Sequence, residues 1–185
     1  MRIGLAQICT IRDLDANLQL VADHTARAAE RSCDVVLFPE ATMRAFGHNL
    51  TEIAQPTDGP WAEGLRSIAD EHGITVVAGM FTPAPDGEKG ARVHNTLLAV
   101  GNGVDTSYDK IHLYDAFGFS ESDTVAAGEE QVRIAPATDE ALTLGLATCY
   151  DVRFPQLFIN HARAGAAGVL LPASWGASPG KIEEW

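Results

Sequence analysis

The chain has 185 residues, of which 46% are hydrophobic and 21% are charged. This length and composition suit one folded domain with a sizeable core and argue against an intrinsically disordered chain. Thirteen Lys and Arg residues against 25 Asp and Glu residues give a formal net charge of -12. The acidic balance argues against nucleic acid and an anionic membrane as partners, because phosphate groups require clustered cations.

Cysteines and targeting signals are both sparse. The sequence holds Cys9, Cys33 and Cys149 without a C-x-x-C pair, which argues against a disulfide scaffold and a zinc ribbon. No apolar run approaches the ~18 residues of a transmembrane helix, and the first residues lack the pattern of a signal peptide. We therefore expect a cytoplasmic protein. Cys9 and Cys33 lie in core-like segments, where we expect both to be inert small hydrophobic residues.

The first half of the chain alternates predicted strands and helices. Short apolar runs indicate buried strands, and apolar residues that recur at helical spacing indicate helices. Asp13 or Asp15 is expected to cap the first helix, whereas proline at its first position and Gly73 at its end delimit the second. In order, the predicted elements are strand 3–8, helix 13–31, strand 35–38, a helix from Pro60 to the stop at Gly73, and strand 74–80.

The second half begins with a predicted hairpin around Gly101-Asn102-Gly103. A long irregular stretch, 111–130, follows, and loops of that length are uncommon in a compact domain unless they are functional. The predicted elements are hairpin strands 93–100 and 104–109, strands 132–135 and 141–148, helix 154–163, strand 168–171 and the first turn of a helix at 181–185. This order predicts an α/β fold whose buried strands are covered on both faces.

Cys149 is the first candidate for a catalytic residue. It lies between the apolar strand 142–148 and the helix that starts at Phe154, and active sites in α/β folds gather at the ends of strands. The thiolate is the nucleophilic form of cysteine, so a catalytic Cys149 requires a base or a positive charge nearby. From spacing alone, a buried and inert structural cysteine is the alternative.

Three further charged residues are candidates by position. Glu40 directly follows the buried strand 35–38, where a carboxylate is placed to act as a general base. Lys110 follows the hairpin, and its compact ammonium is suited to holding a developing oxyanion. Glu121 lies in the long loop. A solvated surface position is the alternative for each of the three.

Three segments, in order along the chain, resemble the nitrilase, or carbon–nitrogen hydrolase, superfamily. They are Phe-Pro-Glu at 38–40, Tyr-Asp-Lys-Ile-His-Leu at 108–113 and Leu-Ala-Thr-Cys-Tyr-Asp-Val-Arg-Phe-Pro at 146–155. The resemblance implies a nitrilase-type α-β-β-α sandwich. It also implies that residues 1–185 are a single carbon–nitrogen hydrolase domain, C-terminally incomplete because it lacks the family's last helix and strands.

The same resemblance implies a catalytic triad of Glu40, Lys110 and Cys149, with Glu121 as a second glutamate. Cys149 would attack the carbonyl carbon of an amide, and Glu40 would take the thiol proton and return one to the leaving ammonia. Lys110 and the backbone N–H of Tyr150 would hold the oxyanion. Water would then hydrolyse the cysteine thioester. No cofactor and no metal is implied.

The segment from Cys149 to Pro155 is most similar to the ω-amidase and deaminated-glutathione-amidase branch. That branch acts on small linear amides that carry a carboxylate, so the resemblance favours such a substrate. Arg153 is placed to pair with the substrate carboxylate, and a structural ion pair at the start of the helix is its alternative. The family also implies a homo-oligomer if the fold is complete.

Two other interpretations compete with the amidase. The G-x-S-x-G pattern at 176–180 matches a serine-hydrolase elbow, but Pro179 has no N–H to donate to an oxyanion hole, which excludes it. The other alternative, a truncated and inactive remnant or an interaction module of the same fold, stays open. A misplacement of about 1 Å costs about 10²-fold in rate, so a shortened chain can keep catalytic residues and lose activity.

Overall fold

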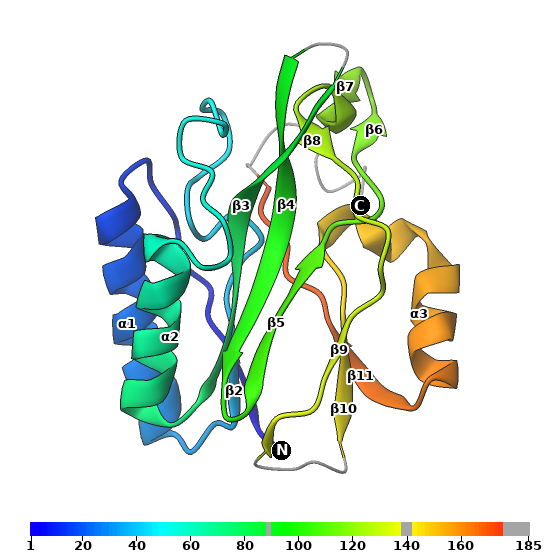
Figure 1. Cartoon of the computed structure of the whole chain (residues 1–185). Helices are drawn as coiled ribbons and strands as arrows, with labels where there is room; N and C mark the ends of the chain where they lie inside the picture. Colours follow the sequence, from blue (N-terminus) through cyan, green and yellow to red (C-terminus); the bar gives the residue numbers. More distant parts are fainter. Residues whose placement is uncertain (88–89, 138–141, 176–185) are drawn as a thin grey trace.

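The computed structural model of the chain describes residues 1–87, 90–137 and 142–175. In these ranges two β-sheets pack face to face, and α-helices cover the outer face of each sheet (Figure 1). This arrangement is the predicted α-β-β-α sandwich. The pattern at 176–180 and the helical turn expected at 181–185 lie outside the described residues.

The first sheet combines parallel and antiparallel strands, and it contains β1 (Ile3–Leu5), β2 (Val35–Leu37), β3 (Thr75–Gly87), β4 (Gly90–Gly101), β5 (Val104–Asp109) and β8 (Val125–Ala126). The strand order is β1-β2-β3-β4-β5, with β8 paired to β4. β1, β2 and β3 are parallel, because long crossover connections separate them. β4 is antiparallel to both β3 and β5, and the predicted hairpin joins β4 to β5.

The crossovers of the first sheet are helices α1 (Leu14–Glu30) and α2 (Pro60–His72). Asp13 is the N-cap of α1, because its Oδ1 accepts the Ala16 N–H at 2.9 Å. The second helix has proline at its first position and ends at Gly73, whose φ of 60° is the left-handed conformation that glycine adopts without strain. Both helices therefore begin and end where the sequence predicts.

The second sheet is smaller and contains β9 (Arg133–Ile134), β10 (Thr143–Leu146) and β11 (Ala166–Leu170). Its order is β11-β10-β9, with β10 parallel to β11 and antiparallel to β9. Helix α3 (Pro155–Arg163) connects β10 to β11 and covers the outer face of this sheet (Figure 1). Its buried His161 packs directly over Gly145, and the His161 Nε2 lies 3.2 Å from the Leu146 carbonyl oxygen.

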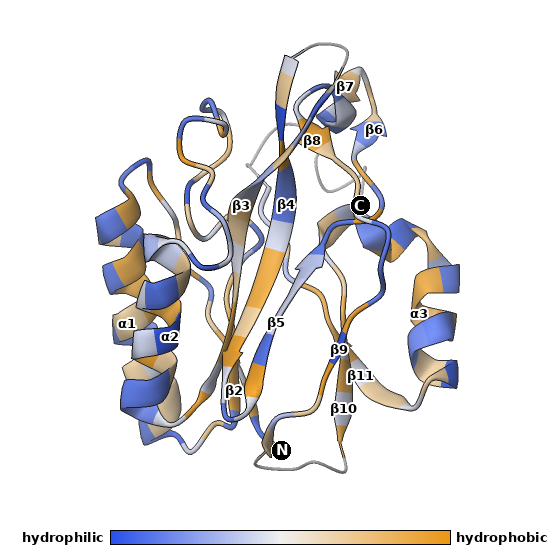
Figure 2. Ribbon diagram, viewed as in Figure 1, coloured by the Kyte–Doolittle hydropathy of each residue, from blue (hydrophilic) through white to orange (hydrophobic). Residues whose placement is uncertain are grey.

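Two apolar clusters separate the layers. One lies between the first sheet and its helices and includes Val21 of α1, Leu65 of α2 and Val76 of β3. The other lies between the two sheets and includes Leu97 of β4 and Leu146 of β10. Figure 2 shows that β4 changes from polar residues near β8 to hydrophobic residues toward its Gly101 end. At the β8 end of β4, the polar side chains lie beside a smaller buried apolar cluster of Ala41, Phe81, Val93 and Val125.

Several sequence predictions need correction. The first strand ends at Leu5 rather than at residue 8, whereas β3 continues past residue 80 to Gly87. Cys9 is exposed, so it is not the core residue that its apolar neighbours indicated, whereas Cys33 is half-buried and packs against the core cluster of the first sheet and its helices. The stretch 111–130 holds short elements: β6 (Asp115–Ala116), β7 (Phe119–Ser120), the 3-10 helix η1 (Glu121–Asp123) and β8. None of the described helices is both long and apolar enough to cross a bilayer.

The segment after β2 is fastened to the middle of β3 at Gly79. The Gly79 N–H donates to the Pro39 carbonyl at 3.2 Å, and the Met43 N–H donates to the Gly79 carbonyl at 2.9 Å. A Cβ at position 79 would overlap the Glu40 carbonyl oxygen, which is backbone and cannot swing away. Glycine at this position is therefore what lets the backbone of Glu40 lie against the sheet.

We predict that Gly79→Ala lowers the free energy of unfolding by roughly 1–3 kcal/mol or more, because the added methyl group displaces the Glu40 backbone. Urea unfolding followed by circular dichroism measures this change. Gly168→Ala in β11 is the matched control, since a Cβ there meets Leu144 Cδ2 at an ordinary 3.6 Å. The control should change stability by less than about 0.5 kcal/mol. Equal effects of the two substitutions would contradict the steric argument.

Candidate active site

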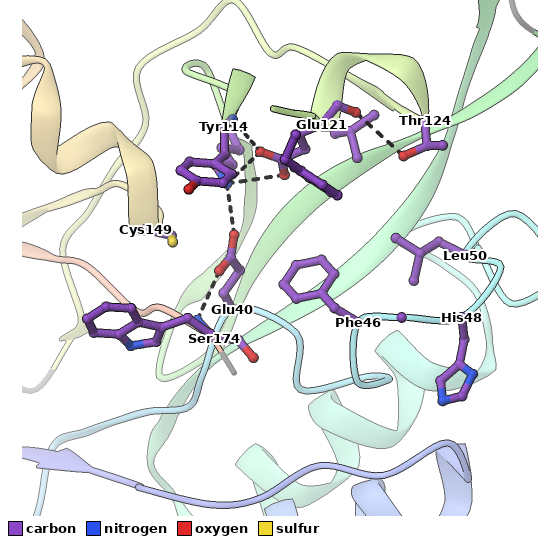
Figure 3. A pocket seen from close by; sticks show the side chains of 14 residues that line it. Glu40, Phe46, His48, Leu50, Tyr114, Glu121, Thr124, Cys149 and Ser174 are labelled. Carbon is purple, nitrogen blue, oxygen red and sulfur yellow. Dashed lines mark hydrogen bonds and ion pairs between the residues drawn. The ribbon is translucent and has the colours of Figure 1, made fainter. Parts of the chain in front are cut away.

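Three charged residues from distant parts of the chain meet at one end of the sandwich. Glu40 follows β2, Lys110 follows β5, and Glu121 begins η1. The Lys110 Nζ lies 2.9 Å from Glu40 Oε1 and 2.9 Å from Glu121 Oε2 (Figure 3). All three residues are buried, with exposed fractions of 1%, 2% and 6% in chain order. The solvated surface positions are thereby excluded for all three.

Two groups that the sequence analysis missed complete the surroundings of Glu40. Asn95 of β4 donates from Nδ2 to Glu40 Oε1 at 2.9 Å and to Glu121 Oε1 at 3.3 Å. The backbone N–H of Ser174 donates to Glu40 Oε2 at 2.9 Å. Asn95 is a polar residue within the predicted strand 93–100, and that break in an apolar run is the signal that could have identified it. Ser174 carries no such signal, because it acts through its backbone.

Glu121 organises the long loop before β8. Its Oε2 accepts the Tyr114 N–H at 2.6 Å, and its own N–H donates to the Tyr114 carbonyl at 3.2 Å. The carboxylate thus binds Lys110 on one side and the loop backbone on the other. This double attachment explains why a loop residue is buried, and it fits the expectation that a long loop here has a function.

Cys149 lies on a sharp turn between β10 and the 3-10 helix η3 (Cys149–Arg153). Its φ of 47° is rare for a residue with a side chain and is the kind of backbone strain that clusters at active sites. The Cys149 N–H donates to the Pro172 carbonyl at 2.8 Å, so the strand end after β11 supports the turn. In Figure 3 the sulfur faces the space beside Glu40, which makes Cys149 part of the same site.

Burial is the main cause that raises the pKa of the Cys149 thiol, and the negative charge of Glu40 raises it further. Lys110 opposes this change but does not outweigh it. For Lys110 itself, burial alone lowers the pKa, but the charges of Glu40 and Glu121 outweigh burial and raise it. Burial and Glu40 thus favour the protonated thiol, and the two carboxylates favour the protonated ammonium.

A buried carboxylate, Asp151, holds the turn in place. Its Oδ2 accepts the Tyr108 hydroxyl at 2.7 Å and the Thr148 N–H at 2.8 Å. Its Oδ1 accepts the His112 backbone N–H at 3.0 Å and lies 2.7 Å from His112 Nδ1. The His112 ring stacks on Phe154, with ring centroids 3.8 Å apart. Asp151 therefore ties the Cys149 turn to the end of β5, close to Lys110.

The remaining two predicted site residues are Tyr150 and Arg153. Tyr150 directly follows Cys149 in the first turn of η3, where N–H groups have no acceptor within the helix. Its role as an oxyanion donor stays a prediction. Arg153 is exposed at the end of η3, and it is not among the described residues that line the cavity beside Cys149. Its contact with a substrate carboxylate likewise stays a prediction.

A cavity of about 440 Å³ opens onto these groups. Its size falls in the usual range for small-molecule sites, roughly 300–1,000 Å³. The residues that line it are Glu40, Phe46, Gly47, His48, Leu50, Lys110, Tyr114, Phe119, Glu121, Thr124, Val125, Cys149, Ser174 and Trp175. Nowhere in the described ranges do three His, Cys, Asp or Glu side chains gather so as to hold a metal ion.

Comparison with known proteins matches this geometry to a family. The profile described as carbon-nitrogen hydrolase matches residues 2–180. The chain therefore belongs to the carbon-nitrogen hydrolase family. A hydrolase of Mycobacterium tuberculosis is 52% identical over 189 residues, covering 100% of this chain and 65% of the relative. A deaminated glutathione amidase of Escherichia coli is 33% identical over 190 residues, covering 100% of this chain and 70% of the relative.

Solved structures of nitrilase-superfamily amidases share the fold. An amidase from Nesterenkonia has a TM-score of 0.78 at 26% identity, covering 100% of this chain and 69% of its own. One variant of that amidase shows acrylamide added to its active-site cysteine, with a TM-score of 0.78 at 28% identity and coverages of 98% and 70%. The chain thus spans between 65% and 70% of the length of each of these relatives and neighbours.

We predict that Cys149 stays a thiol at a pH where a free cysteine, with a pKa of about 8.5, is half ionised. Burial and Glu40 stabilise the protonated form, so ionisation requires a higher pH in the folded protein. The measurement is the ultraviolet thiolate absorbance of the protein minus that of Cys149→Ser, titrated from about pH 6 to about pH 9. Glu40→Gln should move the midpoint down, and the urea-unfolded protein should titrate as a free thiol. A folded midpoint at or below the unfolded one would contradict the prediction.

We also predict that Asp151→Asn lowers the free energy of unfolding by about 1–3 kcal/mol. Each carboxylate oxygen accepts a backbone N–H, so an asparagine in either orientation points its NH₂ group at a donor. Chemical unfolding measures the loss. The control is Asp105→Asn, which removes the negative charge from a surface ion pair with Arg66. This change should cost at most about 1 kcal/mol. Equal losses would show that Asp151 is not the anchor.

Proposed function

We propose that this chain carries the catalytic site of an amidase that hydrolyses the C–N bond of a small linear amide through a thioester on Cys149. The observation that carries the proposal is the meeting of Glu40, Lys110, Glu121 and the strained Cys149 at one cavity. The names of the relatives support it, because deaminated glutathione amidases and nitrilase-superfamily amidases are among them.

The first half of the reaction forms the thioester. The Cys149 sulfur attacks the amide carbonyl carbon while Glu40 takes the thiol proton, which fits a resting thiol beside a buried carboxylate. The Lys110 ammonium and the Tyr150 N–H hold the negative oxygen of the tetrahedral intermediate, and each such donor is worth about 3 kcal/mol. The C–N bond then breaks, and Glu40 returns the proton to the nitrogen, which leaves as ammonia.

The second half releases the acid. Glu40 takes a proton from water, and the resulting hydroxide attacks the thioester carbonyl carbon. The C–S bond breaks and the sulfur regains a proton from Glu40, so one amide and one water give one carboxylic acid and one ammonia. In this scheme Glu121 holds Lys110 at the position where the oxyanion forms, which its ion pair with the Nζ at 2.9 Å supports.

Finer points of the sequence analysis stay predictions. These are a substrate that carries a carboxylate bound by Arg153, a homo-oligomeric assembly and a cytoplasmic location. The chain's own activity is also part of the proposal, because the inactive remnant or interaction module is its alternative. Burying three charged groups costs free energy of desolvation, and a catalytic use of these groups gives a reason for that cost. This favours the enzyme over the remnant.

The test is ammonia release and intact mass after mixing the chain with a panel of small amides that includes both butyramide and ω-amides. We expect ammonia, and after acid quenching a mass increase equal to the acyl group on Cys149. Cys149→Ala should abolish both signals, whereas Cys9→Ala, at an exposed position outside the cavity, should keep them. Residual activity of a few per cent in Cys149→Ala would remove the covalent mechanism. A folded chain without ammonia or adduct would favour the remnant.

A further inference from the structure

A second groove, of about 500 Å³, lies between strand β1 and helix α1. Three arginines and a histidine line it, in a chain whose formal net charge is -12. The described lining residues are Arg2, Ile3, Gly4, Leu5, Ala6, Gln7, His24, Arg27, Ala28, Arg31, Cys33 and Val36. A gathering of cations against the overall charge of the protein indicates a local field that attracts anionic groups.

The cations form a row along α1 and its C-terminal end. His24, Arg27 and Arg31 follow one another at intervals of three and four residues, which places them on one face of a helix. Arg2 Nη1 donates to the Arg31 carbonyl, so a third guanidinium lies at the same end of the row. All three arginines are exposed, and arginine keeps its charge at any ordinary pH. The row therefore presents at least three positive charges to solvent.

The opposite wall of the groove is the edge of a sheet. In the described strand order, β1 is the outer strand next to β2. The Ala6 N–H donates to the Leu37 carbonyl at 2.9 Å, so the backbone of Ala6 faces β2. Because backbone groups alternate in direction along a strand, those of Ile3 and Leu5 face the outer edge. Such an edge is a template on which an extended chain can pair.

The two faces of β1 differ in chemistry. Gly4 faces α1, because a Cβ on it would meet Ala28 Cβ at 3.5 Å. Ile3 and Leu5 point to the opposite face, where Leu5 is in register with Leu37 of the cluster between the sheets. Their exposed fractions are 36% and 77%. A strand added beside β1 would thus meet cations on one face and exposed apolar side chains on the other.

We propose that this groove binds an extended acidic segment of another protein, which adds to β1 as a further strand. Arg27 and Arg31 lie roughly 6 Å apart along the helix axis, since each residue rises by about 1.5 Å. Alternate residues of a strand are about 6.6–6.8 Å apart, which is nearly the same spacing. Carboxylates at alternate positions of the segment therefore face the two arginines, and apolar residues between them pack beside Leu5. Backbone pairing supplies affinity, and the arginines select the acidic sequence.

Two features of the groove favour an acidic peptide over other anions. A peptide can continue the β-ladder of the edge strand, whereas a nucleic acid cannot. The apolar side chains of Ile3 and Leu5 suit the alternate residues of a peptide and offer nothing to a phosphate. Repulsion by the net charge of the chain is screened beyond about 8 Å at physiological salt, whereas the arginine contacts are closer than that.

The probe is the fluorophore-labelled peptide acetyl-Thr-Val-Glu-Val-Glu-Val-Thr-amide, and fluorescence anisotropy measures its binding to the chain. We expect saturable binding that weakens at least about fivefold when both Glu are replaced by Gln. The peptide acetyl-Thr-Glu-Glu-Val-Val-Val-Thr-amide, of the same composition without alternation, should weaken to a similar extent. The probe should also slow amide hydrogen exchange in residues 3–5. Equal affinity for the three peptides, unchanged exchange or no saturable binding would overturn the proposal.

A matched pair of double variants tests the arginine row. Arg27→Gln with Arg31→Gln should weaken probe binding at least about fivefold. Arg12→Gln with Arg163→Gln removes the same charge from exposed positions outside the groove and should change binding by less than about twofold. Circular dichroism should show the parent fold in both. Equal binding by the two double variants would overturn the role of the row.

Two further outcomes would assign the groove to a different occupant. An oligothymidylate that displaces the probe at a lower concentration than the unlabelled peptide would overturn the proposal in favour of nucleic acid. Sedimentation of the chain alone tests a second copy as the occupant. A dimer that the probe dissociates, and that Arg27→Gln with Arg31→Gln abolishes, would assign the groove to self-association and overturn the proposal likewise.

Discussion

The buried ammonium of Lys110 between two carboxylates is the interaction on which the site depends. Three charges out of water are tolerated only because each has close partners, and loss of any one would leave the others uncompensated. The same cluster sets the geometry of the loop that carries Glu121 and of the segment that carries Glu40. A polar network of this kind, with Asn95 and a backbone N–H filling remaining positions, rigidifies the end of the sandwich that holds the site.

A second set of contacts, separate from the ion pairs of Lys110, positions Cys149. The backbone of Cys149 has a left-handed φ, and such a conformation persists only where its surroundings fix it. Asp151 supplies that restraint from one side and the Pro172 carbonyl from the other. Because the thiol is buried beside a carboxylate, its pKa is raised, which favours the protonated form. In the proposed mechanism, Glu40 therefore takes the thiol proton as the sulfur attacks, and it acts at both the start and the end of each half-reaction.

Much of this arrangement was predictable from local patterns. Proline and Gly73 delimit α2, Asp13 caps α1, and the Gly-Asn-Gly turn joins β4 to β5, since these residues act through near neighbours in the chain. Errors arose where the decisive contact was remote. Cys9 has apolar neighbours in sequence, yet it is exposed. Asn95 was not among the predicted site residues, because the residues that it contacts lie 55 positions earlier and 26 later.

The sequence by itself determined the order of the elements, the family and the candidates Glu40, Lys110, Glu121 and Cys149. Residue type, spacing and motif order are local properties, so they can be recognised without coordinates. Only the tertiary structure decided that three of these side chains touch, that burial raises the pKa of the thiol and that Arg153 lies outside the described cavity wall. Distance, burial and electric field depend on how segments as much as 134 residues apart pack together, and no property of a single segment contains that information.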